Sequence, residues 1–554
     1  MSAPQGGRPS RRTVLLAATA AIAGGSGAAA AAVGLSRALH PGPAAGTRSQ
    51  GGGSTAPASP ASPTAASPAG GPRASDWAAL GRELPTGALL RPGDQGYPAA
   101  RRLFDPRFDG LRPAGIASCR SAANVASCIS FARRFGLPIA ARSGGHSYAG
   151  WSSTAGLMVD VGPMQSFRVD GSRVTVGAGL RLIDFYTQLA ARGLAVPGGS
   201  CPTVGIAGLT LGGGVGVLGR QYGLTCDNLA GLEMVTADGR IRQVDAGHDQ
   251  DLLWASQGGG GGNFGIATSF TFTARPLASL TQFFLSWPWS QAARVVGGWQ
   301  GWAPHLSDRW WANLHLAAAP GATVPLSVQV GGTFLGSPAD AGGELSRLFA
   351  AVGSEPSSGE PFESPYLHAM LIEAGCSSLT TDQCHLPGSQ PGHRPGGQLV
   401  REPELAKSDF FTRPLPASGL TELLHGVEQF LGVRPAAGGS GGIALDACGG
   451  AINKPGPGDT AFVHRDTLFL AQYTTTWATG AAGGGVGRQR DWQRSWYQAM
   501  RPYASGQAYQ NYIDPALASW RQAYYGANYP RLARIKAAYD PQRLFRFPQA
   551  ITPG

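Results

Sequence analysis

The sequence predicts an α+β protein with two large domains of different character. Between residues 118 and 256, stretches with the three- and four-residue spacing of amphipathic helices alternate with short β-rich stretches. After about residue 280, apolar and polar residues alternate singly, which is typical of half-buried antiparallel strands. A chain of 554 residues is long enough to bury a core in each of two or three domains.

The first domain should begin with a helix that Ser121 caps and Gly136 ends, because the residues between them carry helical apolar spacing. Asp238 and Gly239 are turn residues and predict a hairpin between two strands. The other expected elements are strands at 137–142, 157–161 and 173–179 and helices at 182–191 and 251–255, while the hairpin strands are 232–237 and 241–245.

The second domain should contain one large antiparallel sheet with helices on one face. Single alternation of apolar residues predicts its strands, and helical spacing predicts two helices between them. The strands are expected at 282–289, 312–317, 326–334 and 468–474, and the helices at 339–351 and 420–431.

The first 75 residues look like an export signal and a tether. Arg11 and Arg12 precede an apolar run that reaches about Leu35, which predicts a twin-arginine signal within residues 1–40 and export to the cell envelope or outside by that machinery. The alternative is an ordinary secretory signal or an anchor helix, but alanine and glycine make this run a poor permanent membrane span. Residues 41–75 are rich in proline, serine, alanine and glycine, which predicts a disordered linker.

The charged residues and cysteines exclude some functions. The net charge of +11 is spread over dispersed arginines without interleaved aromatics, so nucleic-acid binding is not expected. No spacing of cysteine or histidine suggests a metal site. Cys376 and Cys384 can close a small loop as a disulfide in an exported protein; the alternative is two buried thiols.

Two glycine-lined loops each carry one reactive side chain. Residues 142–150 read Arg-Ser-Gly-Gly-His-Ser-Tyr-Ala-Gly and contain His146, and residues 198–214 contain Cys201 among seven glycines. Glycine lets backbone N–H groups approach a phosphate closely. Imidazole and thiol groups are nucleophiles that can attack an electron-poor ring.

Together these loops resemble those of the berberine bridge enzyme-like FAD-linked oxidases. Residues 258–268, the Tyr-Gln-Asn-Tyr of 509–512 and residues 524–529 and 536–547 also resemble segments of that family. The resemblance implies FAD bound covalently to both His146 and Cys201. It also implies a discontinuous FAD-binding domain of the PCMH type, residues 105–279 completed by 506–552, around a substrate domain at 280–505. Further cofactor-binding residues implied by it are Arg142, Ser143, Gly144, Gly145, Ser147, Val204, Gly205, Gly208, Gly212, Gly213, Gly214, Gly265, Ile266, Asn511 and Tyr512.

The resemblance also places Tyr148, Gln472 and Tyr509 beside the flavin. Hydride loss from a carbon next to oxygen needs a base for the other proton, and we expect Tyr509 to be that base. An unperturbed tyrosine has a pKa of about 10, so hydrogen bonds from Tyr148 or another donor should lower it. Gln472 cannot act as a base and stands where some family members carry a carboxylate. Tyr512 competes for the role, and each of these side chains has the alternative of merely lining the core or the substrate site.

The expected function is oxidation of an alcohol or hemiacetal by an exported enzyme, with O2 reduced to H2O2. Val204 matches the position that gates oxygen in the family, and a small β-branched residue there resembles the oxidases. The alternatives are an oxidative cyclase or tailoring oxidase of a secondary metabolite, an oxygen-blocked dehydrogenase, and a non-catalytic flavin- or sugar-binding protein. The identity of the substrate does not follow from these motifs.

Overall fold

The computed structural model describes residues 71–481 and 483–554. The predicted export signal and most of the predicted linker lie outside these residues. Helix α2 (Ala74–Glu83) begins at Ala74, so the last two residues expected to belong to the linker are already helical. Strand β1 (Leu89–Leu90) and helix α3 (Tyr97–Ala100) follow, ahead of residue 105 where the first domain was expected to start.

The first part of the chain builds two sheets and confirms the expected helix and hairpin. Helix α4 (Ala122–Phe135) is capped by Ser121, whose hydroxyl accepts from the Asn124 N–H at 3.3 Å, and ends at Gly136 with φ 62°. A four-stranded sheet has the order β1-β2-β4-β3, with β2 Gly115–Ser118, β3 Ile139–Arg142 and β4 Leu157–Asp160. A five-stranded antiparallel sheet has the order β5-β6-β10-β8-β9, with β5 Phe167–Asp170, β6 Arg173–Gly177, β8 Leu229–Thr236, β9 Ile241–Asp245 and β10 Gly265–Thr273.

Short helices connect these strands. They are α5 Leu182–Ala190, α6 Ile206–Leu211, α7 Gly219–Tyr222 and α8 Gln250–Ser256, and the small strands β7 Leu194–Ala195 and β11 Arg275–Pro276 pair beside them.

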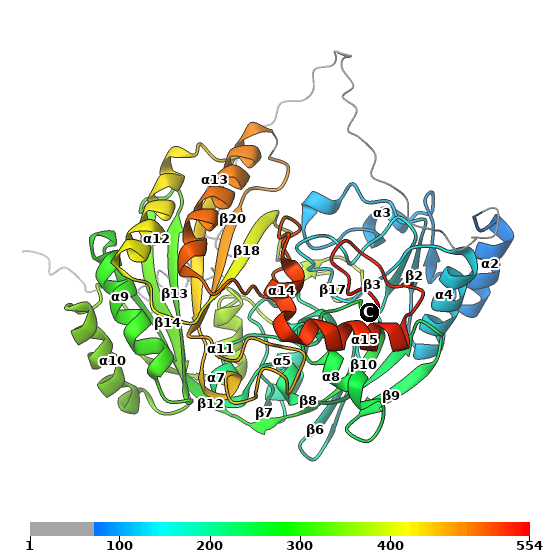
Figure 1. Cartoon of the computed structure of the whole chain (residues 1–554), viewed down its shortest axis with the longest axis horizontal. Coiled ribbons are helices and arrows are strands. Elements are labelled where there is room, and N and C mark those ends of the chain that lie inside the picture. Colours follow the sequence, from blue (N-terminus) through cyan, green and yellow to red (C-terminus); the bar gives the residue numbers. More distant parts are fainter. Residues whose placement is uncertain (1–70, 482) are drawn as a thin grey trace, which may run out of the picture.

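The second part is a seven-stranded antiparallel sheet in the order β15-β12-β14-β13-β19-β20-β18. Its strands are β12 Ser279–Trp287, β13 Trp310–Ala318, β14 Leu326–Phe334, β15 Phe362–Pro365, β18 Glu404–Phe411, β19 Ser440–Ala447 and β20 Phe469–Thr476. Figure 1 shows helices on the outer face of this sheet: α9 Ala292–Trp302, α10 Pro338–Val352, α12 Ala417–Gln429 and α13 Gly484–Met500. Every second residue of the strands points into an apolar core with these helices, for example Leu314, Leu445 and Phe469.

The loops of the second part carry a disulfide between Cys376 and Cys384, as expected. It follows helix α11 (Tyr366–Glu373) and precedes the small parallel pair β16 (Leu386–Pro387) and β17 (His393–Arg394). None of the helices within residues 71–481 and 483–554 is long and apolar enough to cross a membrane.

The end of the chain returns to the first part, where helices α14 (Trp520–Tyr525) and α15 (Tyr529–Tyr539) lie across it (Figure 1). The buried Lys536 ammonium donates to the Asn263 carbonyl at 2.5 Å and pairs with Asp540 at 2.6 Å. The Ile551 N–H donates to the Asn263 side chain at 2.9 Å. The glycine-rich segment before β10 is therefore held by residues from the last turns of the chain.

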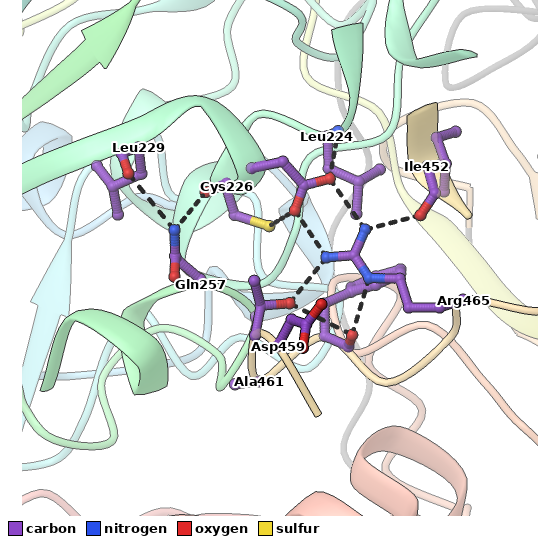
Figure 2. A network of polar contacts seen from close by, with 12 residues as sticks. Leu224, Cys226, Leu229, Gln257, Ile452, Asp459, Ala461 and Arg465 are labelled. Atoms are coloured by element: carbon purple, nitrogen blue, oxygen red, sulfur yellow. Dashed lines mark hydrogen bonds and ion pairs between the residues drawn. The ribbon is translucent and has the colours of Figure 1, made fainter. Parts of the chain in front are cut away.

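A buried ion pair joins the two parts (Figure 2). The Arg465 guanidinium donates to both carboxylate oxygens of Asp227, at 2.6 and 2.9 Å. Its remaining N–H groups reach the carbonyls of Ile452 and Phe462 and the Thr460 hydroxyl. A bidentate pair with all its donors satisfied is the arrangement that offsets the cost of burying two charges.

Candidate active site

A cavity of about 460 Å³ lies where the first part of the chain meets the inner face of the seven-stranded sheet. The two predicted loops form its wall together with the glycines at 260–262 and the returning segment at 509–513. The predicted site residues that line it are Ser143, Gly144, Gly145, His146, Ser147, Tyr148, Cys201, Val204, Gly205, Gly208, Gly265, Ile266, Gln472, Tyr509, Asn511 and Tyr512.

The two loops pack backbone against backbone. A Cβ atom at Gly144 would lie 2.3 Å from the Gly205 nitrogen, and one at Gly205 would lie 2.3 Å from the Gly144 nitrogen. Glycine is therefore required at both positions for the loops to approach. Cys201, half-buried and outside any disulfide, is thereby held on the same wall as His146.

The imidazole of His146 is fixed in place and uncharged. Its Nε2 lies 2.9 Å from the Thr203 hydroxyl, and its ring stacks on Phe104 with centroids 3.9 Å apart. Burial lowers the pKa of His146 to about 3, and the nearby Arg181 charge acts in the same direction. A neutral imidazole keeps a lone pair, which is the form that acts as a nucleophile.

Four predicted cofactor-binding residues do not line the cavity. Arg142 points to Asp160, with which it forms a buried ion pair at 2.6 Å. Gly212, Gly213 and Gly214 instead lie behind the wall, next to the returning segment. A Cβ at Gly212 would lie 2.0 Å from the Asn511 amide oxygen, so glycine allows this segment to pack closely.

Tyr509 is buried, with 2% exposure, and its oxygen is surrounded by N–H donors. The Gly214 N–H lies at 2.7 Å, the Asn511 side-chain amide at 3.0 Å and the Val215 N–H at 3.3 Å. Burial raises the pKa of Tyr509 to about 12 and the three donors oppose it. Three donors on one oxygen are suited to a phenolate, which can only accept hydrogen bonds.

Tyr148 contacts Gln472 rather than Tyr509. The Gln472 amide donates to the Tyr148 hydroxyl at 2.9 Å, so the donors that act on Tyr509 come from Gly214, Asn511 and Val215 instead. The ring of Tyr512 lies edge-on to both Tyr148 and Tyr509, with centroids 5.8 and 4.9 Å away. The three tyrosines and Gln472 thus form one continuous patch of the cavity wall.

Known protein families match the segments that form the cavity wall. Family models described as FAD binding domain and as berberine and berberine like match residues 113–245 and 508–552. The uncharacterised FAD-linked oxidoreductase YvdP of Bacillus subtilis (strain 168) is 34% identical over 487 residues, which are 86% of this chain and 100% of that protein. The chain belongs to the berberine bridge enzyme-like FAD-linked oxidoreductases.

Other members of the berberine bridge enzyme-like family act on sugars. Chitooligosaccharide oxidase of Gibberella zeae is 29% identical over 85% of this chain and 93% of its own length. The structure of Phl p 4, a grass pollen allergen with glucose dehydrogenase activity, matches with a TM-score of 0.73 at 27% identity, over 86% of this chain and 99% of the allergen.

The cavity fits the FAD of this berberine bridge enzyme-like enzyme. Gly145, Gly260 and Gly262 line it with φ between 74° and 87°, where a Cβ would be strained. Main-chain N–H groups of such loops can lie against phosphates without side chains in the way. Within residues 71–481 and 483–554, no group of His, Cys, Asp and Glu side chains is arranged to hold a metal ion.

Polar side chains that the sequence motifs do not predict line the opposite wall. Asn313 and His315 on β13 lie on the inner face of the sheet and line the cavity, together with the carboxylates of Glu373, Glu402, Glu404 and Asp446. The alternation of Asn313 and His315 in the expected strand was the available signal. The carboxylates gave none, because they come from three segments far apart in the sequence.

Proposed function

We propose that this enzyme is an exported oxidase that removes a hydride from the CH–OH carbon of an alcohol or hemiacetal, with FAD attached to both His146 and Cys201. The observation that carries the proposal is that both nucleophiles share a cavity wall with a tyrosine whose oxygen faces three N–H donors. When bound, FAD accepts the hydride and returns the electrons to O2, giving H2O2.

The residues of the chain divide the remaining work. His146 would hold the flavin covalently, and the contact of its Nε2 with the Thr203 hydroxyl fixes the orientation of the ring. Tyr509 takes the hydroxyl proton of the substrate, and its N–H donors stabilise the phenolate. Tyr148, held by Gln472, orients the substrate hydroxyl. Val204, small and on the cavity wall, leaves room for oxygen.

An oxygen-blocked dehydrogenase is the second candidate, because the relative Phl p 4 has glucose dehydrogenase activity. Turnover with O2 and with an artificial electron acceptor distinguishes the oxidase from the dehydrogenase. Purified protein should be yellow and, on a panel of sugars, sugar alcohols and polycyclic aglycones, should form one H2O2 per substrate oxidised. Turnover with an artificial electron acceptor but not with O2 would establish the dehydrogenase, and colourless protein would support a binding protein.

Export by the twin-arginine route is proposed from Arg11 and Arg12. Replacing both with lysine should trap folded, yellow protein in the cytoplasm, because that machinery reads the arginine pair. Fractionation of cells that express either form measures this. Equal export of the Lys-Lys form would instead indicate an ordinary secretory signal.

A further inference from the structure

Part of the inner face of the seven-stranded sheet carries polar side chains towards the cavity, in contrast to the apolar helix-covered face. Asn313 of β13 pairs with Asp446 of β19, and His315 lies two residues further along the same face. The Asn313 amide is fixed on both sides: its oxygen accepts from the Gly331 N–H at 3.1 Å, and its nitrogen lies 2.8 Å from His315 Nε2. This row therefore presents a rigid polar wall to the cavity.

Four carboxyl groups line this wall of the cavity. Glu373 ends helix α11, Glu402 and Glu404 lead into β18, and Asp446 lies on β19. Glu402 follows Arg401, which is anchored to Asp109 through two bonds of 2.5 and 3.0 Å. The carboxylates are thus placed by structured backbone and are not side chains of a free loop.

These four carboxyl groups lie outside the ion pairs that the structure describes. Across residues 71–481 and 483–554, none of the four takes part in a salt bridge. Asp105 and Glu402 are the charges that act most on Glu404, and the opposing Arg107 guanidinium is already bonded to Asp105 at 2.7 Å. Glu404 is 94% buried, being 6% exposed, and its Oε1 has no hydrogen-bond partner.

Leaving a carboxyl group buried without a partner costs free energy that a bound ligand can recover. Burial raises the pKa of Glu404 to about 8, with further contributions from Asp105 and Glu402. It likewise raises the pKa of Glu373, Glu402 and Asp446 to about 7. The negative charges of Asp446 and Glu404 also raise the pKa of Tyr512, so both carboxyl groups act electrostatically on this tyrosine.

These carboxylates suit an organic cation better than a metal ion. The described side chains contain no cluster of three or more acidic, histidine or cysteine groups that converge as metal ligands do. An ammonium group needs only one or two carboxylates at hydrogen-bond distance, and the remaining negative field attracts it from further away. Because burial raises the pKa of these groups to about 7 or 8, they are partly protonated at neutral pH, and a bound ammonium group favours the ionised form.

We propose that the cavity selects a cationic substrate, an alcohol that carries a protonated amino group, which the buried carboxyl group of Glu404 binds. This inference rests on the proposed function for the oxidised alcohol and adds the charge of the molecule that carries it. It assigns Glu404 to substrate recognition and leaves proton removal to Tyr509.

The test separates binding from turnover. Benzylammonium, benzyl alcohol and benzoate have the same ring and differ in charge, and their affinity for the flavin-loaded enzyme can be measured by titration calorimetry. Benzylammonium should bind ~10–100-fold more tightly than benzyl alcohol, the usual worth of a charge-assisted hydrogen bond, and benzoate should bind least. Above pH 8, where Glu404 is ionised, Glu404→Gln should remove most of this preference. Glu355→Gln, on the outer surface after α10, is the matched control and should keep it.

Equal or tighter binding of benzyl alcohol, or no measurable binding of any of the three, overturns the inference. A preference that survives Glu404→Gln also overturns it. The proposed function is tested separately by anaerobic flavin reduction with fully deacetylated and N-acetylated chitotetraose. If neither sugar reduces the flavin while benzylammonium binds selectively, sugar oxidation fails and the cation site stands. If the neutral sugar is the better substrate, oxidation stands and the cation site fails.

Discussion

Tyr509→Phe is expected to slow anaerobic flavin reduction by ~10²–10⁴, the usual contribution of one general base. The substitution removes only the hydroxyl oxygen that Gly214, Val215 and Asn511 contact, so the packing of the buried ring is kept. Stopped-flow measurement of flavin bleaching with a saturating substrate gives the rate. Reoxidation by O2 should be almost unchanged, because that step does not use this proton acceptor.

The pH dependence provides an independent check on Tyr509. Because its pKa is raised to about 12, the phenolate fraction grows about tenfold for each pH unit between neutrality and pH 10, and the wild-type rate should rise with it. The Phe variant should lose this rise. Tyr366→Phe is the control, since Tyr366 is buried, its hydroxyl has no partner, and it lies off the cavity. A large loss in Tyr512→Phe with a normal Tyr509→Phe would transfer the role of base to Tyr512.

Removal of both attachment residues should release all of the flavin. Acid precipitation of the wild-type protein should leave the yellow colour in the pellet, as should His146→Ala or Cys201→Ala alone, because the other bond remains. The double variant His146→Ala/Cys201→Ala should release its flavin into the supernatant. Absorbance of both fractions and the mass of each intact protein measure the outcome.

Cys448→Ala is the matched control for attachment, because Cys448 is a buried thiol that does not line the cavity. Its flavin should remain in the pellet. If either His146→Ala or Cys201→Ala alone loses its flavin to the supernatant, the flavin is attached only through the residue that was replaced. Wild-type protein whose flavin washes out would contradict covalent attachment altogether.

Much of the fold follows from local signals. The α+β class, the helix from Ser121 to Gly136 and the hairpin at Asp238 are confirmed, because caps and turns are chosen by neighbouring residues. Strand β19 was missed because its sequence begins Ser-Gly-Gly and depends on its two neighbours for stability. Helix α13 was missed because its exposed face is strongly polar. The proposed domain boundaries stay predictions.

The site was predictable where residues adjacent in sequence act together. The loops around His146 and Cys201 carry their chemistry within a few residues, and the cavity brings them together as expected. The group of carboxyl side chains that lines the cavity was not predictable. Glu373 and Asp446, for example, come close to each other only because distant strands pair and the end of a helix packs against the sheet. The roles of Tyr509, Tyr148 and Gln472 remain predictions, although the structure places all three on one wall.

The return of the chain end has a consequence for biosynthesis. About 300 residues separate Cys201 from Tyr509, which at ~5–20 residues per second means roughly 15–60 s between the synthesis of these two parts of the cavity wall. A nascent chain therefore displays both nucleophiles while Tyr509 and Asn511, which bond to residues 209–215, have not yet been made. Capture of the cofactor in a closed site must wait for release from the ribosome. A secretion pathway that exports unfolded chains would export this protein without its flavin, whereas a pathway that exports folded proteins would export it with the flavin bound.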